Sequence, residues 1–359
     1  MAIEKDILMA AAFEPDSTPS LRCDLHNAIT HFAHSTFECD MTDPHSIELV
    51  HFGNKRWANY FKVVLLGLQS VLPPEVRQNA HGTIKVLVDG TVPPESSLSS
   101  SAAMTTCSSI VILTALQALH VVPRKVIADV ACHSERLVGV HSGGMDQAVS
   151  VFGQRDMALF VSFAPTLHVS PVELPLGNQY VFLVTNTMIK SDKKATAPER
   201  YNLRVVETRL AAAVLKRVLQ TKSDIPIQFR DTLRSVSDTF WAGHTGDWDK
   251  ILHEFDDVRH ACHDLGLEAG HLQAMLNIVE HHIPRRGLSR EEVENLVGIH
   301  GVDFDHHFLK DFHIRASEFF LHARAFHAPR HCVCSNSMPC SNARTPITHR
   351  ARPTLIRIA

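Results

Sequence analysis

The sequence predicts a protein of the α+β class with two domains, and three observations support this. A segment of alternating β-branched residues, 81–92, ends in two prolines and a serine-rich loop that leads directly into a long helix. Helical periodicity dominates residues 201–328, whereas the preceding part mixes strand and helix patterns. A length of 359 residues is enough for two domains, and 45% hydrophobic with 20% charged residues is typical of a globular protein. We therefore expect a mixed α/β domain at 1–190, a mostly helical domain at 191–328 and a disordered tail at 329–359.

The charge and the targeting signals exclude two classes of partner. A formal net charge of −3 with a pI near 6.8 provides no basic surface for nucleic acid. The N-terminus is too acidic for a signal peptide, and no stretch approaches the roughly 20 apolar residues that span a bilayer. We expect a cytoplasmic protein with no membrane partner. Its eight cysteines have no paired framework, so reduced thiols are expected.

The first elements follow from hydrophobic periodicity. Residues 1–12 alternate weakly and predict a strand. The segment 47–72 becomes helical after Lys55, and one face of this helix carries Tyr60, Val63, Val64, Leu68 and Val71. Residues 81–92 predict the strand that leads into the serine loop.

The later elements are mostly helical. Residues 123–140 predict a helix, and another begins near Met145 or Asp146. Residues 157–163 and 179–187 predict strands. The helix from Tyr201 to about Leu219 carries one apolar face, formed by Leu203, Val206, Leu210, Val214 and Val218. A capping box begins the helix that ends at Val297, and its members are Ser289 and Glu292.

The serine loop is the first candidate site. Ser99, Ser100 and Ser101 place hydroxyls and backbone N–H groups where a helix N-terminus favours an anion. The alternative is a serine-rich surface loop that only caps the helix, and the spacing alone favours this plainer interpretation.

A second candidate site lies about forty residues further on. Gly143 and Gly144 permit a tight turn, and Asp146 follows at the start of a helix, where the helix dipole stabilises its anion. Such a carboxylate can accept or orient the proton of a hydroxyl group. For an isolated aspartate after glycine, the alternative is a plain helix cap.

Together these two stretches resemble the galactokinases, which belong to the GHMP superfamily of small-molecule kinases, and the fungal type in particular. The family's loops read approximately PxGxGLSSSAA and GGMDQ, and both are recognisable within residues 88–116 and 138–153. Residues 54–62 and 199–207 also resemble the family's WxNY and YNLR segments, and the similarity extends to about residue 328. The resemblance implies a two-domain GHMP kinase fold and ATP-dependent phosphorylation of galactose, or a related hexose, at the C1 hydroxyl.

The resemblance also implies a role for each matching residue. It assigns the nucleotide and its phosphates to Trp57, Ser96, Ser97, Ser99, Ser100 and Ser101. It assigns Mg²⁺ to Ser100 and Glu135, and the sugar to Gly143, Gly144, Asp146 and Tyr201, with Asp146 as catalytic base or hydroxyl anchor. Plainer alternatives are a core aromatic pair for Trp57 and Tyr60, a solvated helix residue for Glu135 and a packing residue for Tyr201.

The sequence departs from the family pattern in three places. Glu95 and Ser97 stand where the family has loop glycines, so we expect weaker nucleotide binding. The family's GRVNLIGEHxDY segment and its C-terminal glycine-rich motif are not found, which predicts a truncated protein with a partial second domain and impaired activity. The tail changes to a Pro-, Ser-, Arg- and Cys-containing composition that predicts disorder.

Two further hypotheses stay open. The first is a galactose- and ATP-binding sensor without kinase activity that contacts a regulatory protein partner; retention of Ser100, Ser101, Ala102 and Ala103 favours kinase ancestry instead. The second is an inactive product that folds poorly. The histidines of the second domain have no complete metal-ligand spacing, so we expect no metal site among His253, His260, His263, His281, His282, His306 and His307.

Overall fold

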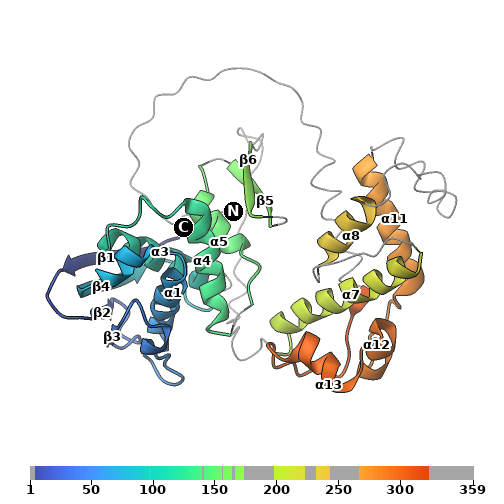
Figure 1. Ribbon diagram of the computed structural model, residues 1–359, viewed down its shortest axis with the longest axis horizontal. Coiled ribbons are helices and arrows are strands. Elements are labelled where there is room, and N and C mark those ends of the chain that lie inside the picture. The colour runs from blue at the N-terminus through green and yellow to red at the C-terminus, as the bar shows by residue number, and fades with distance from the viewer. Residues whose placement is uncertain are drawn as a thin grey trace, which may run out of the picture. The chain divides into compact units, whose positions relative to one another are not determined.

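The computed structural model describes residues 5–96, 98–139, 141–155, 157–163, 166–173, 198–222, 232–242 and 267–322 (Figure 1). The chain divides between Lys194 and Ala195 into two compact units. The boundary expected between residues 190 and 191 and the tail expected at 329–359 lie outside the described residues. In the part that is described, no helix combines the length and apolar character needed to cross a membrane.

A mixed four-stranded sheet forms one layer of the first unit (Figure 1). Its order is β1 (Ile7–Glu14), β4 (Gly82–Gly90), β2 (Leu21–Asn27) and β3 (Ser35–Cys39). The β1–β4 and β2–β3 pairs are antiparallel, whereas β4 and β2 run parallel. The strand expected at residues 1–12 is therefore confirmed as an element but lies slightly later in the chain.

Helices cover one face of this sheet, and the other face is open in the described part of the unit. Alternate strand residues point into the core, including Leu21, Cys23 and Leu25 of β2 and Ile84, Val86 and Val88 of β4. The opposite positions point outward, so Leu8 and Leu87 are each 48% exposed. The helices of the unit are α1 (Asn59–Gln69), α2 (Pro74–Gln78), α3 (Ser100–Ala115), α4 (Arg124–Arg136) and α5 (Met145–Phe152), with 3₁₀ turns at Pro44–Ser46 and Arg56–Ala58.

The helix starts follow from local sequence. Pro123 precedes α4, and Gly144, at φ +88°, precedes α5. The predicted helix 123–140 ends early because a turn follows Arg136. Of the apolar face expected for α1, Val63, Val64 and Leu68 are buried, whereas Val71 lies beyond the helix and is exposed.

A separate hairpin follows α5. It pairs β5 (Met157–Ser162) with β6 (His168–Glu173) in antiparallel register, which confirms the strand predicted at 157–163. The strand predicted at 179–187 lies outside the described residues. The cysteines within the described residues, Cys23, Cys39, Cys107 and Cys132, are buried and free, and burial raises the pKa of the Cys107 thiol to about 12.

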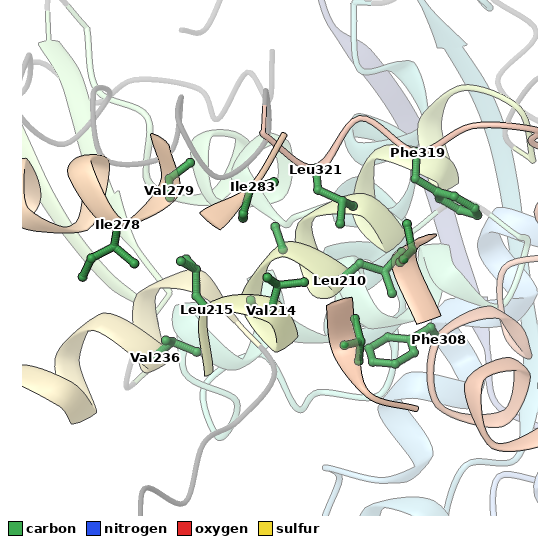
Figure 2. Packing of buried hydrophobic residues seen from close by; sticks show 14 of the residues in the cluster. Leu210, Val214, Leu215, Val236, Ile278, Val279, Ile283, Phe308, Phe319 and Leu321 are labelled. Carbon is green, nitrogen blue, oxygen red and sulfur yellow. The ribbon is translucent and has the colours of Figure 1, made fainter. Parts of the chain in front are cut away.

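The described part of the second unit is helical, with one isolated β-bridge between Leu288 and Phe319. Its elements are α7 (Tyr201–Lys222), α8 (Leu233–Ala242), α11 (Leu267–His282), α12 (Arg290–Val297), α13 (Gly301–Phe304) and a π-turn at Asp305–Leu309. The capping box of Ser289 and Glu292 is confirmed. Figure 2 shows side chains of α7, α8 and α11 and of the segment ending at Leu321 converging on one hydrophobic cluster. The unit therefore has its own core.

Candidate functional site

A cavity of about 530 Å³ lies in the first unit, beside the N-terminus of α3. Most of its wall comes from the end of β4 and the serine loop after it, the residues that lead into α1, and the loop that follows β2. Ile7 of β1, Met104 of α3 and Val138 after α4 complete the wall. The residues that line it are Ile7, Asn27, Ile29, His31, Phe32, Gly53, Asn54, Arg56, Trp57, Asn59, Tyr60, Val88, Asp89, Gly90, Val92, Pro94, Glu95, Ser99, Ser100, Ser101, Met104 and Val138. A cavity of this size is typical of sites for drug-sized ligands, which occupy roughly 300–1,000 Å³.

The N-terminus of α3 provides the anion-binding feature of this cavity. Ser99, Ser100 and Ser101 all line it, and α3 begins at Ser100. Ser99 takes a left-handed conformation at φ +59° and makes no side-chain capping hydrogen bond. The first-turn N–H groups thus lack the side-chain acceptor that usually caps a helix, and a phosphate can fill that role.

Glu95 occupies one of the positions where the family has glycine, and its backbone has the glycine-like conformation. Its φ is +58°, a value that residues with a Cβ adopt only at an energetic cost. Glu95 and Asp89 are acidic residues among those that line the cavity, and Arg56 is a cationic one. The loop thus keeps the backbone shape of a phosphate-binding turn but adds strain and negative charge.

The other serines of the loop have different positions. The Ser96 hydroxyl donates to the Pro93 carbonyl at 2.7 Å, which closes the loop on itself, and Ser96 is not among the residues that line the cavity. Ser97 lies outside the described residues. Direct contact of these two serines with phosphate stays a prediction.

Trp57 combines the two roles that the sequence left open. Its side chain is 8% exposed and packs in the core, where its Nε1 donates to the Ala33 carbonyl at 2.9 Å. The Phe32 ring lies beside it with centroids 6.3 Å apart. Trp57 and Tyr60 also line the cavity, so a core aromatic residue forms part of the cavity wall.

Glu135 is buried, which contradicts its interpretation as a solvated helix residue. Its side chain is 2% exposed, and Oε2 accepts hydrogen bonds from Ser142 Oγ at 3.0 Å and Gln147 Nε2 at 2.5 Å. These donors flank the turn at 143–146, so Glu135 holds that turn from both sides. Among the described residues, Glu135 takes part in no ion pair, whereas buried carboxylates usually have a cationic partner.

Helices α3, α4 and α5 carry buried polar atoms that have no hydrogen-bond partner. Gln147 Oε1 and Ser134 Oγ are buried without a hydrogen-bond partner, and on α3 the same is true of Thr106 Oγ1 and Ser108 Oγ. The helices α3, α4 and α5 that carry these atoms pack on one another. Unsatisfied groups of this kind are commonly completed by buried water.

The second predicted loop starts α5. Gly144 has φ +88°, and a Cβ there would lie 3.0 Å from Cys132 Sγ and 3.1 Å from the Phe163 ring. Gly143 is exposed with open space around it. Asp146 is half-buried in the first turn of α5, on a helix that packs against α3 and α4, and it is not among the residues that line the cavity. Its contact with a sugar stays a prediction.

Comparisons with known proteins identify the family of part of this chain. Residues 59–154, which include the serine loop, Glu135 and Asp146, match the family described as GHMP kinases N terminal domain. This region is a GHMP kinase N-terminal domain. Its mixed α/β architecture confirms the predicted fold class.

Galactokinases are among the relatives that the whole chain matches. The galactokinase of Candida albicans is 30% identical over 333 residues, which cover 91% of this chain and 60% of that protein. The galactokinase of Candida parapsilosis is 31% identical over 281 residues, covering 76% and 52%. A crystal structure of Lactococcus lactis galactokinase complexed with galactose shares 20% identity with a TM-score of 0.45, over 84% of this chain and 70% of that one. The chain spans about half to three-fifths of the length of the curated galactokinases that it matches.

The YNLR segment lies in the second unit of the GHMP kinase chain, at the start of α7. Tyr201 is 36% exposed, and the next residue, Asn202, is buried and donates from Nδ2 to the Phe312 carbonyl at 3.4 Å. Glu207 is fully buried, and its carboxylate accepts from Arg204 Nη1 at 2.8 Å and from the Phe320 backbone N–H at 2.9 Å. Asn202 and Glu207 therefore hold the segment around residues 312–320 against α7. Sugar binding by Tyr201 stays a prediction.

Sequence reasoning missed part of the cavity wall of this GHMP kinase domain. Asn27, Ile29, His31 and Phe32 come from the end of β2 and the loop after it. The apolar residues at every second position of 21–25 were a strand signal, but its short length made it weak. Arg56 was visible in the WxNY-like segment, yet no spacing rule singled it out.

Proposed function

We propose that this protein transfers the γ-phosphoryl group of ATP to the C1 hydroxyl of galactose. The observation that carries the proposal is the N-terminus of α3, which has no side-chain cap and opens into a cavity of about 530 Å³ next to Trp57, in a chain homologous to galactokinases. Phosphoryl transfer requires positioning and charge neutralisation more than covalent chemistry, and these are what such a site can supply.

ATP is the proposed nucleotide. Its phosphates lie against the N–H groups and hydroxyls of Ser99, Ser100 and Ser101, and the Arg56 guanidinium supplies positive charge on the same cavity wall. Trp57 contributes an aromatic surface against which the adenine packs.

Mg²⁺ is the proposed metal, and Ser100 and Glu135 would hold it. The donor chemistry fits, because Mg²⁺ prefers oxygen ligands, Ser100 provides a hydroxyl on the cavity wall and Glu135 provides a buried carboxylate. When bound, Mg²⁺ neutralises negative charge on the phosphates. Glu135→Gln should raise the Mg²⁺ concentration that gives the half-maximal rate.

Asp146 is the proposed catalytic residue. It orients the sugar hydroxyl and accepts its proton, while Gly143 and Gly144 let the backbone approach the sugar closely. Tyr201 is proposed to contact the same sugar. The proposed location of the enzyme is the cytoplasm.

The test is galactose-dependent formation of ADP by the full chain. Asp146→Asn should lower turnover by about 100-fold or more, because positioned acid–base groups typically contribute that much. Asp129→Asn, a half-buried residue of α4, is the matched control and should retain the wild-type rate. Equal rates for wild type and Asp146→Asn would remove Asp146 from the mechanism. If ADP forms at the same rate with and without galactose, galactose is not the substrate.

A further inference from the structure

A cluster of two histidines and one aspartate lies on the outer face of the sheet, which no helix of the described part covers. Asp24 and His26 are two residues apart on β2, so their side chains leave the same face of the strand. The antiparallel pairing of β2 with β3 places Asp24 opposite Thr36, and this register brings His34, just before β3, beside His26.

The three side chains converge on one point. Their ligating atoms all lie within 4.8 Å of one another. His26 Nε2 is 3.5 Å from Asp24 Oδ1, and His34 Nε2 bonds to the same oxygen. The two imidazole rings stack with centroids 4.2 Å apart and an angle of 18° between their planes, so both present Nε2 to the carboxylate.

We propose that Asp24, His26 and His34 bind a divalent transition-metal ion, and that Zn²⁺ fits the donor set best. Two imidazole nitrogens and one carboxylate oxygen are common zinc ligands, whereas Mg²⁺ and Ca²⁺ prefer sites made of oxygen alone. Ligands at about 2.1 Å from a tetrahedral ion lie roughly 3.4 Å apart. The His26–Asp24 separation of 3.5 Å already has this value, and ordinary side-chain rotations bring in the third ligand.

The surroundings of the cluster are those of an accessible ion site. The side chains of His26 and His34 are 54% and 52% exposed and that of Asp24 is 26% exposed, so an ion can enter from solvent. Thr36 Oγ1 donates to Asp24 Oδ1 at 3.1 Å and fixes the carboxylate, as outer-shell partners do in metal sites. Three protein ligands leave one tetrahedral position for water.

The simpler alternative is a surface ion pair between one protonated histidine and Asp24. An ion pair of that kind needs one imidazole, whereas here two stacked rings face the same oxygen. The second imidazole adds a nitrogen donor that a single ion pair does not need and that a metal ion can use.

A bound ion would also fix the position of a segment that lines the cavity. His34 follows Ala33, whose carbonyl accepts the Trp57 Nε1 hydrogen bond and whose N–H donates to the Asn54 carbonyl at 3.2 Å. The segment between His26 and His34 contributes Ile29, His31 and Phe32 to the cavity. An ion held by both histidines therefore fixes the two ends of that segment. The metal site itself does not depend on the proposed kinase activity.

The experiment is a Zn²⁺ titration of the full chain against a chromophoric chelator. All samples carry Cys332→Ser, Cys334→Ser and Cys340→Ser, so that thiolates of the C-terminal segment do not compete. We expect one Zn²⁺ per chain, with affinity reduced about 100-fold or more by His34→Gln and by His26→Gln, since even outer-shell substitutions cost about 10–100-fold. The control His133→Gln, an exposed histidine of α4, should bind as tightly as the parent.

Two further measurements guard against a folding artefact. Thermal unfolding in the presence of EDTA should be the same for parent and variants, and added Zn²⁺ should raise the midpoint of the parent and of His133→Gln but not of His34→Gln. Co²⁺ should give the visible absorption of a four-coordinate site in the parent, and Asp24→Asn should lose it. Absence of Zn²⁺ binding by the parent, or unchanged affinity in His26→Gln and His34→Gln, would overturn the proposal.

Discussion

In the GHMP kinase domain, α3 and α5 each follow a turn that contains residues in the left-handed conformation. The two turns differ in which residue types adopt that conformation. Gly144 precedes α5 at φ +88°, whereas the loop before α3 uses Glu95 at +58° and Ser99 at +59°. The first turn has no room for a side chain and is held by the buried Glu135. The second accepts side chains and is closed by the Ser96 hydroxyl. Steric room, rather than the conformation alone, thus separates the turn that requires glycine from the turn that tolerates its loss.

Gly144→Ala should have the largest effect on stability. The added Cβ would lie 3.0 Å from Cys132 Sγ and 3.1 Å from the Phe163 ring, in a conformation that disfavours a side chain. Strain and overpacking together should lower the free energy of unfolding by about 2–3 kcal/mol, measured by urea denaturation. Gly143→Ala is the matched control, because nothing lies within 4 Å of its added methyl group, and it should change stability by less than about 0.5 kcal/mol. Similar losses in both variants would show that the contact with Cys132 and Phe163 is not decisive.

Glu135→Ala should rank next. It removes the acceptor of two buried hydrogen bonds and leaves Ser142 and Gln147 unpaired, which should cost about 2 kcal/mol. Glu75→Ala, on the exposed side of α2, should be nearly neutral in the same denaturation assay. If Glu135→Ala keeps full stability while losing its Mg²⁺ dependence, the carboxylate serves the ion and not the turn.

Glu95→Gly should stabilise the turn before α3, where Glu95 has a left-handed backbone. Removing the left-handed strain gains about 1–2 kcal/mol, of which the flexibility of unfolded glycine takes back about 0.5–1 kcal/mol, so a net gain of about 0.5–1 kcal/mol is expected. Loss of the negative charge should also tighten ATP binding several-fold, measured by titration with a fluorescent ATP analogue. Glu95→Gln separates the two effects, because it removes the charge but keeps the strain.

The local elements of the two turns could be predicted from the sequence, but their long-range contacts could not. The strand, serine loop and helix of the first site were readable because periodicity and proline mark them locally. The turn at Gly144 was readable from the glycines themselves, whereas the glycine-like position of Glu95 was visible only through the family pattern. Contacts between residues distant in the sequence were not predictable. These are the hydrogen bonds of buried Glu135 with Ser142 and Gln147, the Trp57–Ala33 hydrogen bond, and the approach of His34 to Asp24 across two strands. The short strands β2, β3 and β6 were missed because each has only five to seven residues, which is too few for their alternation to stand out.

Ser99→Gly should have the smallest effect and should sharpen the comparison most, because it separates backbone shape from hydroxyl chemistry. Ser99 makes no capping hydrogen bond, so glycine relieves its left-handed strain without loss of a cap, and stability should rise by about 0.5 kcal/mol. If the hydroxyl contacts phosphate, ATP affinity should fall about threefold at the same time, since a hydrogen bond is worth about 0.5–1.5 kcal/mol. Ser99→Ala retains the strain and should lose the affinity without the gain in stability. Tighter ATP binding by Ser99→Gly would mean that backbone shape, and not the hydroxyl, limits how the helix terminus receives the phosphates.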